Sequence, residues 1–382
     1  MAIRYLTLLV ALVAVGLLAG RTAGAQSVDT PATHALMIDA MTGAILLEKN
    51  ADVPMPPASM SKLMTLLMVF ERLDDGSIGL EDTIRVSEAA WRMGGSRMFV
   101  EHNSRVSISD LLRGVIVQSG NDASVVFAEG LSGSEEAFAD EMNRRADEIG
   151  LTGSTFRNST GWPDPEHRTT ARDLTTIAAR IITAFPEYYK IFQEREYTYN
   201  NIKQGNRNPL LYKDIGADGL KTGHTEESGY GLVASVERKG RRLILVVNGL
   251  ESVKQRSMES ERLLDMGFRD FNNYPFFAAN AVVDDAEVWL GAETRVPLVI
   301  EDEVLLTMSR KTRRDITVTV AYESPISAPI VRGARLAELR IEGPNMEPVV
   351  RDLVAGVAVD RLGFVGRLGT AISHIVWGTQ SP

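Results

Sequence analysis

Two side chains suited to acyl transfer lie three residues apart in the stretch Pro56-Pro57-Ala58-Ser59-Met60-Ser61-Lys62. If a helix begins here, Ser59 and Lys62 share one of its faces, because positions three apart are neighbours on a helix. A neutral lysine amine within hydrogen-bond distance can take the proton of a serine hydroxyl and leave the oxygen nucleophilic. The pair alone is a weak signal, since Ser-x-x-Lys occurs by chance and Ser59 is also well placed as a helix cap.

Two more polar segments follow in a fixed order. Ser119-Gly120-Asn121 comes at the end of an apolar helical pattern, and Lys221-Thr222-Gly223 leads directly into a strand that begins near Tyr230. Ser-x-x-Lys, Ser-Asp-Asn and Lys-Thr-Gly form the active-site set of class A β-lactamases and penicillin-binding proteins. This chain carries the three elements in the same order, with Gly120 in place of the aspartate, and the complete set is far more specific than any one element.

Longer stretches carry a family resemblance. Residues 57–65, 118–123 and 218–225 resemble the serine-type D-alanyl-D-alanine carboxypeptidases, which are low-molecular-mass penicillin-binding proteins of the peptidase S11 type. The similarity covers nearly the whole chain. It implies an α/β catalytic domain of the penicillin-binding protein/β-lactamase type, with an antiparallel sheet packed against helices. It also implies a small all-β, sandwich-like second domain, peptidoglycan stem peptides as substrates and β-lactam antibiotics as covalent inhibitors.

The resemblance assigns catalytic roles that are chemically reasonable. Ser59 attacks the carbonyl between the two terminal D-alanines, D-alanine leaves, and water then hydrolyses the acyl-enzyme. Lys62 is the base, which requires burial and a nearby cation such as Lys221 to lower its pKa from about 10.4. Ser119 passes the proton toward the leaving amine. Asn121 holds the lysine and a substrate amide.

The substrate-binding assignments follow from the same resemblance. Lys221, Thr222 and Gly223 meet the substrate carboxylate, and the backbone N–H groups of Ser59 and His224 form the oxyanion hole. Arg256 resembles the family arginine that helps to bind the terminal carboxylate. The alternative for Arg256 is a solvated charge on a helix, which is the usual fate of a helical arginine.

The N-terminus has the order of a secretory signal. Arg4 precedes the apolar run Leu6–Leu18, and Ala23-Gly24-Ala25 supplies small residues for cleavage after Ala25. A run of 13 apolar residues is shorter than the roughly 20 that cross a bilayer, which favours a cleaved signal over an anchor. We therefore expect a protein that is secreted across the cytoplasmic membrane. The family resemblance implies that it is periplasmic and attached peripherally to the inner membrane.

The elements that must position these residues can be predicted from hydrophobic patterns. Apolar runs at 35–38 and 44–47 surround a Gly-containing turn, and runs at 231–236 and 243–247 enclose a charged turn, so each pair predicts a hairpin. Helices are expected from Ser59, over 108–117 and over 135–149. Because the hairpins bracket the helices, one mixed sheet with strands from both ends of this region is expected.

The remaining sequence predicts two further regions. Short alternating segments at 296–300, 304–308, 316–321 and 336–341 indicate a β-rich domain. The predicted organisation is a signal peptide at 1–25, a D,D-peptidase domain at 26–274, the β-rich domain at 276–360 and a tail at 361–382. In the tail, Phe364, Leu368, Ile372 and Ile375 recur at helical spacing, and by resemblance this amphipathic segment attaches to the membrane, with Trp377 at the interface. The alternative is a terminal helix that packs on the β-rich domain.

Composition excludes several other classes. The net charge is −9, and becomes −11 once the predicted signal is removed, which argues against a nucleic-acid partner. There is no cysteine, and the five histidines have no ligand spacing, so neither a metal nor a cofactor is expected. A β-lactamase would need a water-activating carboxylate that the sequence does not reveal. A D,D-endopeptidase that cuts cross-links and an inactive penicillin-binding scaffold stay open as alternatives.

Overall fold

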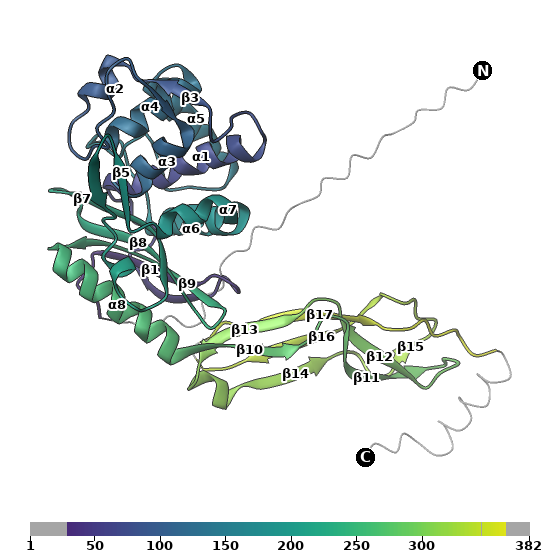
Figure 1. Cartoon of the computed structure of the whole chain (residues 1–382). Coiled ribbons are helices and arrows are strands. Elements are labelled where there is room, and N and C mark those ends of the chain that lie inside the picture. Colours follow the sequence, from purple (N-terminus) through teal and green to yellow (C-terminus); the bar gives the residue numbers. More distant parts are fainter. Residues whose placement is uncertain (1–28, 345, 364–382) are drawn as a thin grey trace, which may run out of the picture.

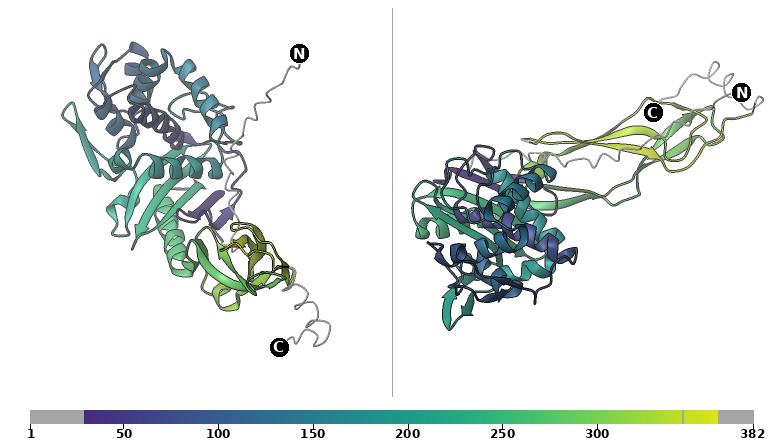
Figure 2. Two further views of the ribbon diagram at one scale, coloured as in Figure 1. Left: turned by 90° about the vertical axis from the view of Figure 1, so that its right-hand side faces the viewer. Right: turned by 90° about the horizontal axis from the view of Figure 1, so that it is seen from above.

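The computed structural model describes residues 29–344 and 346–363 (Figure 1). The predicted signal peptide and the tail from residue 364 onward lie outside the described residues. The described chain divides into an N-terminal body, residues 29–270, which contains helices and strands, and a C-terminal body, residues 271–363, which is built almost entirely of strands. Figure 2 shows the C-terminal body as an elongated element that projects from the N-terminal one.

A five-stranded antiparallel sheet forms the centre of the described N-terminal body. In spatial order its strands are β2 (Ile45–Lys49), β1 (His34–Asp39), β9 (Arg241–Leu250), β8 (Gly229–Arg238) and β7 (Ala217–Thr225). Both predicted hairpins are confirmed, as is the contribution of strands from both ends of this region. Every neighbouring pair of strands runs antiparallel, which confirms the antiparallel sheet that the family resemblance implies. The mixed sheet expected from the hydrophobic pattern alone is wrong.

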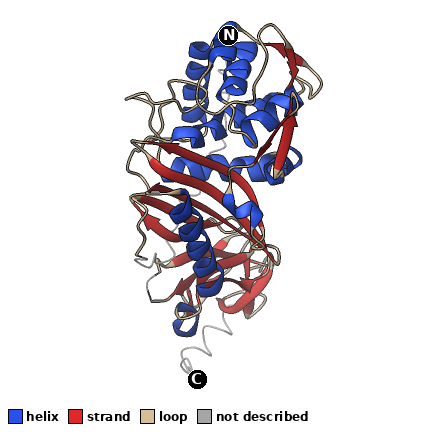
Figure 3. Cartoon of the chain, turned by 60° about the vertical axis from the view of Figure 1, so that its left-hand side comes forward, coloured by secondary structure: helices blue, strands red, loops and turns tan. Residues whose placement is uncertain are grey.

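The sheet is covered on both faces, which explains the unbroken apolar run in β9. Ile244 and Val246 belong to a core shared with the helical lobe, whereas Leu243, Leu245 and Val247 belong to a core that includes the inner face of α8 (Val253–Asp270). Successive residues of a strand point to opposite faces, so a strand covered on both sides is apolar throughout. Figure 3 shows α8 on one side of the sheet and the other helices on the opposite side.

Capped helices make up the lobe that carries two of the three sequence motifs. The main helices are α1 (Lys62–Asp74), α3 (Ile108–Ile116), α4 (Asn121–Ser132), α5 (Glu135–Glu148) and α6 (Ala171–Ala184). The predicted helices at 108–117 and 135–149 are confirmed. Their N-cap hydroxyls, on Ser107 and Ser134, each accept a hydrogen bond from the backbone N–H three residues on, which satisfies one of the free donors at a helix start.

Shorter elements complete this body. They are the helices α2 (Glu88–Arg92) and α7 (Pro186–Tyr189), the 3-10 turns η1 (Ala58–Ser61), η2 (Lys190–Gln193) and η3 (Pro209–Tyr212), and the strands β3 (Thr83–Arg85), β4 (Arg105–Ser107), β5 (Glu196–Tyr199) and β6 (Ile202–Gly205).

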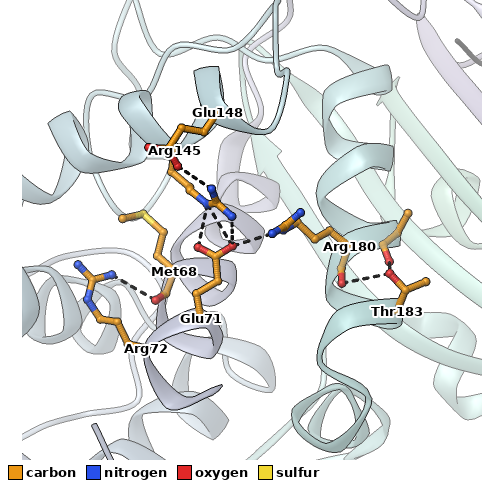
Figure 4. A network of polar contacts seen from close by, with 8 residues as sticks. Met68, Glu71, Arg72, Arg145, Glu148, Arg180 and Thr183 are labelled. Carbon is orange, nitrogen blue, oxygen red and sulfur yellow. Dashed lines mark hydrogen bonds and ion pairs between the residues drawn. The ribbon is translucent and has the colours of Figure 1, made fainter. Parts of the chain in front are cut away.

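A network of charges joins three of the helices (Figure 4). The carboxylate of Glu71 on α1 accepts hydrogen bonds from Arg145 on α5, at 2.7 Å from Nη2, and from Arg180 on α6, at 3.3 Å. All three side chains are half-buried, and Arg145 also pairs with Glu148 on its own helix. The network fixes α1, which begins next to Ser59, against its neighbours.

Strands dominate the described C-terminal body, as the alternating segments predicted. One sheet has the order β14 (Thr317–Ala321), β16 (Arg335–Glu342), β17 (Val349–Ala355), β12 (Arg295–Ile300), β11 (Ala281–Trp289) and β15 (Ile326–Ser327), and β10 (Phe271–Phe277) pairs with β13 (Val304–Ser309). A 3-10 turn, η4 (Thr312–Asp315), follows β13. A separate apolar core lies between these strands. The boundary expected at residue 274 falls inside β10.

The described end of the chain is still part of the C-terminal body. The Leu362 N–H donates to the carbonyl of Leu290 at 2.9 Å, and the Ala292 N–H donates to Asp360 O at 2.7 Å. Residues 361 and 362 therefore pair with the β-rich body. Among the described residues, no helix has the length and apolar character needed to cross a bilayer.

Candidate active site

Ser59 lies in the 3-10 turn η1, and Lys62 is the first residue of α1, so the predicted helical spacing is present with a tighter first turn. Ser59 is half-buried, whereas the Lys62 side chain is completely buried. Ala58, directly before Ser59, has a φ of 48°, a left-handed conformation that a residue with a Cβ adopts at an energetic cost. This backbone conformation turns the chain sharply just before Ser59.

The Lys62 amine has three oxygen neighbours. Its Nζ lies 3.0 Å from Ser59 Oγ, 2.7 Å from Asn121 Oδ1 and 2.5 Å from the Thr160 carbonyl. The amide and carbonyl oxygens can only accept hydrogen bonds, so they take two N–H groups of the amine. A neutral lysine then has its lone pair left for the third neighbour, the Ser59 hydroxyl. This is the arrangement that a serine–lysine general-base pair requires.

The environment of Lys62 favours its neutral form. Burial lowers the pKa of Lys62 and the positive charge of Arg207 adds to the effect, whereas the carboxylates of Asp122 and Glu135 oppose it; the result is a shift from 10.5 to about 7. The sequence pointed to Lys221 as the nearby cation. Lys62 and Lys221 are coupled in the structure, because the charge of Lys62 lowers the pKa of Lys221. Arg207, to which no sequence motif pointed, is a further cation that lowers the pKa of Lys62.

Asn121 is held so that its carbonyl oxygen faces Lys62. Its Nδ2 donates to the Gly94 carbonyl at 2.9 Å, and its backbone N–H donates to Ser96 O at 2.7 Å. Asn121 is also the first residue of α4, where backbone N–H groups lack partners within the helix. The segment 94–96 therefore fixes the orientation of the amide.

Ser119 and Lys221 form a second hydroxyl–amine pair. Lys221 Nζ donates to Ser119 Oγ at 2.7 Å and to the Thr222 carbonyl at 3.1 Å, and both side chains are buried. Burial lowers the pKa of Lys221 well below its ordinary value, and the charges of Lys62, Arg207 and Arg256 add to the effect. Ser119 itself has a φ of 57°, so the chain turns sharply at this motif as well.

A glycine is required where β7 passes the nucleophile turn. A Cβ at Gly223 would lie 2.8 Å from the Pro57 carbonyl oxygen and 3.2 Å from Ala58 Cβ. Any other residue would push the strand away from η1. Gly223 therefore lets β7 bring Lys221 and Thr222 up to the site.

A pocket of about 480 Å³ joins these groups. Ser59, Ser119, Thr222, Gly223 and His224 line it together with residues that come from other parts of the chain, namely Ser96, Arg207, Tyr230, Val253 and Arg256. Of the nine residues predicted for the site, six line the pocket directly. A seventh, Lys221, contacts the pocket residue Ser119. The other two, Lys62 and Asn121, lie just behind Ser59.

Arg256 is buried, which contradicts the alternative that it is a solvated charge. Its Nη1 donates to the Gly231 carbonyl at 3.4 Å, its guanidinium lies 5.7 Å from the centre of the Tyr230 ring, and its buried Nε has no hydrogen-bond partner. Burial lowers its pKa to about 10. Within the described residues no carboxylate forms an ion pair with Arg256 or Arg207, so this end of the pocket is suited to an anionic ligand.

His224 is exposed at the rim of the pocket. Its ring stacks on Tyr230 with 3.9 Å between ring centres. The residues pair across β7 and β8, so the stack follows from the strand register. No sequence signal pointed to Tyr230 or Arg207, because Tyr230 acts through its cross-strand neighbour and Arg207 lies in an irregular loop before η3.

A second buried pair supports the nucleophile turn. Ser61 Oγ lies 2.7 Å from His167 Nε2, and the Arg157 backbone N–H donates to His167 Nδ1 at 3.2 Å. Nδ1 is thus an acceptor, so Nε2 carries the hydrogen and donates it to Ser61. Burial lowers the pKa of His167 to about 4, which keeps the ring neutral. His167 is also absent from the sequence-based prediction.

The described residues contain no group of three histidine or carboxylate side chains able to hold a metal ion. At the pocket these residues form two hydroxyl–amine pairs, Ser59 with Lys62 and Ser119 with Lys221. The pocket also has an end lined by Arg207 and Arg256 that is suited to an anionic ligand. Such a set supports covalent acyl transfer to serine.

Comparisons with known proteins agree with this chemistry. Residues 21–252 match the family model described as D-alanyl-D-alanine carboxypeptidase, and residues 271–361 match the C-terminal domain of penicillin-binding protein 5. The D-alanyl-D-alanine carboxypeptidase DacA of Haemophilus influenzae is 36% identical over 345 residues, which cover 89% of this chain and 88% of DacA.

Solved structures give the same result. The D-alanyl-D-alanine carboxypeptidase DacD of Francisella tularensis has a TM-score of 0.79 at 29% identity and covers 88% of this chain and 95% of its own. Penicillin-binding protein 5 of Haemophilus influenzae has a TM-score of 0.76 at 35% identity, with 88% of this chain and 100% of its own covered. A D-alanyl-D-alanine endopeptidase of Escherichia coli is 30% identical over only 59% of this chain.

Proposed function

The chain belongs to the serine-type D-alanyl-D-alanine carboxypeptidases, enzymes of peptidoglycan metabolism, and we propose that Ser59 is the residue that becomes acylated. The supporting observation is the contact of Ser59 Oγ with a buried Lys62 amine whose two other neighbours can only accept hydrogen bonds. Ser59 is the hydroxyl in the pocket that has this partner.

In the acylation step, Ser59 Oγ forms a bond to the carbonyl carbon of the penultimate D-alanine while its proton moves to Lys62 Nζ. The oxyanion accepts hydrogen bonds from the backbone N–H groups of Ser59 and His224. The C–N bond to the terminal D-alanine then breaks, and the leaving nitrogen takes the proton that Ser119 passes on from Lys62, so that Lys62 is neutral again. Asn121 keeps Lys62 in position and binds the substrate amide.

Deacylation returns the enzyme to its starting state. A water molecule loses a proton to the Lys62 amine and attacks the ester carbonyl. The C–O bond to Ser59 then breaks, and Lys62 returns the proton to Ser59 Oγ. During acylation, before D-alanine leaves, the terminal carboxylate of the substrate lies at the end of the pocket where Lys221, Thr222 and Arg256 meet. Arg207 lines the same end of the pocket, so its guanidinium is the fourth side chain that can bind that carboxylate.

Peptide mapping of a labelled penicillin adduct tests the assignment of Ser59. The label is expected on Ser59, and Ser59→Ala is expected to remove it. Labelling of Ser61 or Ser119 in the wild type, together with acylation of Ser59→Ala, would refute the assignment. Incubation with pentapeptide and with cross-linked muropeptides then separates carboxypeptidase activity from the endopeptidase alternative, because the first releases D-alanine and the second releases two stem peptides.

We also propose that the chain is secreted, cleaved after Ala25 and held at the outer leaflet of the cytoplasmic membrane by its tail. The proposed organisation is a D,D-peptidase domain, a β-rich domain and an amphipathic tail. Arg361 pairs with Gly291, and the Leu362 N–H donates to the Leu290 carbonyl, so both residues belong to the β-rich body. The informative truncation therefore ends at Gly363.

The truncated protein is expected to keep its muropeptide hydrolysis and to move from the membrane pellet to the soluble fraction, largely regardless of salt, since attachment would depend on apolar side chains. Equal binding of liposomes by the full-length and truncated proteins would refute the anchor.

A further inference from the structure

A second, narrower groove begins on the other side of the nucleophile turn. One wall is the segment 161–168, and the other is the end of β7 and the turn after it. Its lining includes Ala58 next to the nucleophile, Trp162, Asp164 and Arg168 on the first wall, and Thr225 and Glu227 on the second. It shares no lining residue with the main pocket, although the two approach each other at Ser59 and His224.

The direction of the bound peptide follows from the proposed function, on which this inference rests. The terminal carboxylate lies near Thr222 and Arg256, and the reacting carbonyl lies at Ser59. Residues along β7 continue from Thr222 to Thr225, a rise of about 3.3 Å each. The acyl part of the substrate therefore extends past His224 and reaches the second groove within about one residue of the peptide.

An ion pair crosses this groove from one wall to the other. Arg168 Nη2 donates to Glu227 Oε1 at 2.9 Å, and the free space left in the groove is about 10 Å³, room for a single water molecule. The Arg168 side chain is 30% exposed and that of Glu227 is 58% exposed, so Glu227 is the partner that moves into solvent most easily. Partly exposed pairs contribute little to stability, and opening this one costs little.

Arg168 has unused capacity for a ligand. Its Nη1 is buried and has no hydrogen-bond partner. Asp164 lies along the same wall as Arg168, and the exposed Trp162 ring packs over Gly94 and Gly95 beside it. The groove thus holds a cation with a free donor, two carboxylates and an apolar ring.

We propose that this groove binds a side chain of the stem peptide that ends in an amino group and a carboxylate on the same carbon. The ligand carboxylate takes the place of Glu227 on Arg168 and also reaches the free Nη1, and the ligand ammonium binds the displaced Glu227 carboxylate. The methylene groups of the ligand lie along Trp162. One ion pair between the walls is exchanged for two ion pairs with the substrate.

A side chain that carries only an amine satisfies half of this site. It can bind Glu227, but then Arg168 loses its partner and gains nothing in return. The groove therefore distinguishes a zwitterionic side chain, such as that of meso-diaminopimelate, from that of lysine.

Two soluble pentapeptides that end in D-Ala-D-Ala and differ only in meso-diaminopimelate or lysine at the third position test the proposal. The wild type is expected to favour the diaminopimelate peptide about tenfold or more in kcat/KM, the effect of one charged hydrogen bond. Arg168→Gln is expected to lose most of that preference, by a loss on the diaminopimelate peptide with a smaller change on the lysine peptide. Glu227→Gln, on an exposed turn, is expected to reduce the preference as well.

Arg157→Gln is the matched control, because Arg157 forms an exposed ion pair with Glu166 in the same segment, 3.1 Å away. It is expected to keep the wild-type preference. An equal rate on both peptides in the wild type, or an equal loss on both in Arg168→Gln, would overturn the proposal. Failure of the proposed function is distinguishable, since the wild type would then hydrolyse neither peptide and penicillin would not label Ser59.

Discussion

The rate of acylation by penicillin should depend on pH through the ionisation of Lys62. With a pKa of about 7, half of the molecules hold the neutral amine at pH 7, and about 1% hold it at pH 5. A lysine with the ordinary value of 10.5 would be neutral in about one molecule in 3,000 at pH 7. The whole shift, caused by burial and then by the charge of Arg207, corresponds to about 5 kcal/mol in favour of the neutral amine.

The measurement is the acylation rate constant at saturating labelled penicillin, followed by rapid mixing between pH 5 and pH 9. We expect a tenfold rise per pH unit below pH 7 and a plateau above it. His167 is neutral throughout this range, because its pKa is about 4. Saturating conditions remove the effect of Lys221, whose lowered pKa weakens carboxylate binding at high pH. A rate that is independent of pH, or one that still rises tenfold per unit at pH 9, would refute the assignment of Lys62 as base.

Three further predictions concern the groups around the nucleophile turn. Lys62→Arg should abolish acylation at every pH in the range, because a guanidinium keeps its proton, and near-normal labelling would remove Lys62 from proton transfer. Gly161→Ala should destabilise the fold by roughly 2 kcal/mol or more and slow acylation, because the φ of Gly161 is +74° and the new Cβ would lie 1.9 Å from the Ala58 carbonyl oxygen. The control is Gly133→Ala, where φ is +84° but the space around the residue is open. In urea unfolding the control should lose only about 1 kcal/mol. His167 binds a proton in the unfolded chain below pH 6.5 but in the folded chain only below about 4, so stability falls by about 3 kcal/mol as pH drops across that window. His167→Gln should flatten this part of the curve of unfolding free energy against pH, and an unchanged slope would contradict the assignment.

Local patterns predicted most of the fold. Short apolar runs on either side of a turn located the hairpins around residues 40 and 240, and helical spacing located the helices at 108 and 135, because both signals are local in the sequence. The direction of the strands in the central sheet is a long-range property, and the expectation of a mixed sheet was accordingly wrong. The boundary between the two bodies lies where α8 ends, at Asp270, and not at residue 274 as expected. No local sequence signal marked the end of this helix.

The site divides in the same way. Ser59, Lys62, Ser119, Asn121, Lys221 and Thr222 stood out because each belongs to a short motif with a fixed order. Arg207 and His167 did not, since their importance comes from contacts with residues 145 and 106 positions away in the chain. The position of Arg207 near the buried Lys62 is visible only once the loop that carries Arg207 has folded against the pocket.

The pairing of β1 with β9 has a consequence for the order of folding. β1 (His34–Asp39) lies between β2 and β9 (Arg241–Leu250), so the first strand of the chain completes its hydrogen bonds only when a strand about 200 residues later has formed. Contacts of such long range make folding slow, and they leave an incomplete chain with an open sheet edge. The turn that carries Ser59 rests against β7 of the same sheet. A nascent or clipped chain that lacks β9 therefore contains Ser59, Lys62 and Asn121 but has no assembled active site, and hydrolysis begins only after the polypeptide has been synthesised beyond residue 250.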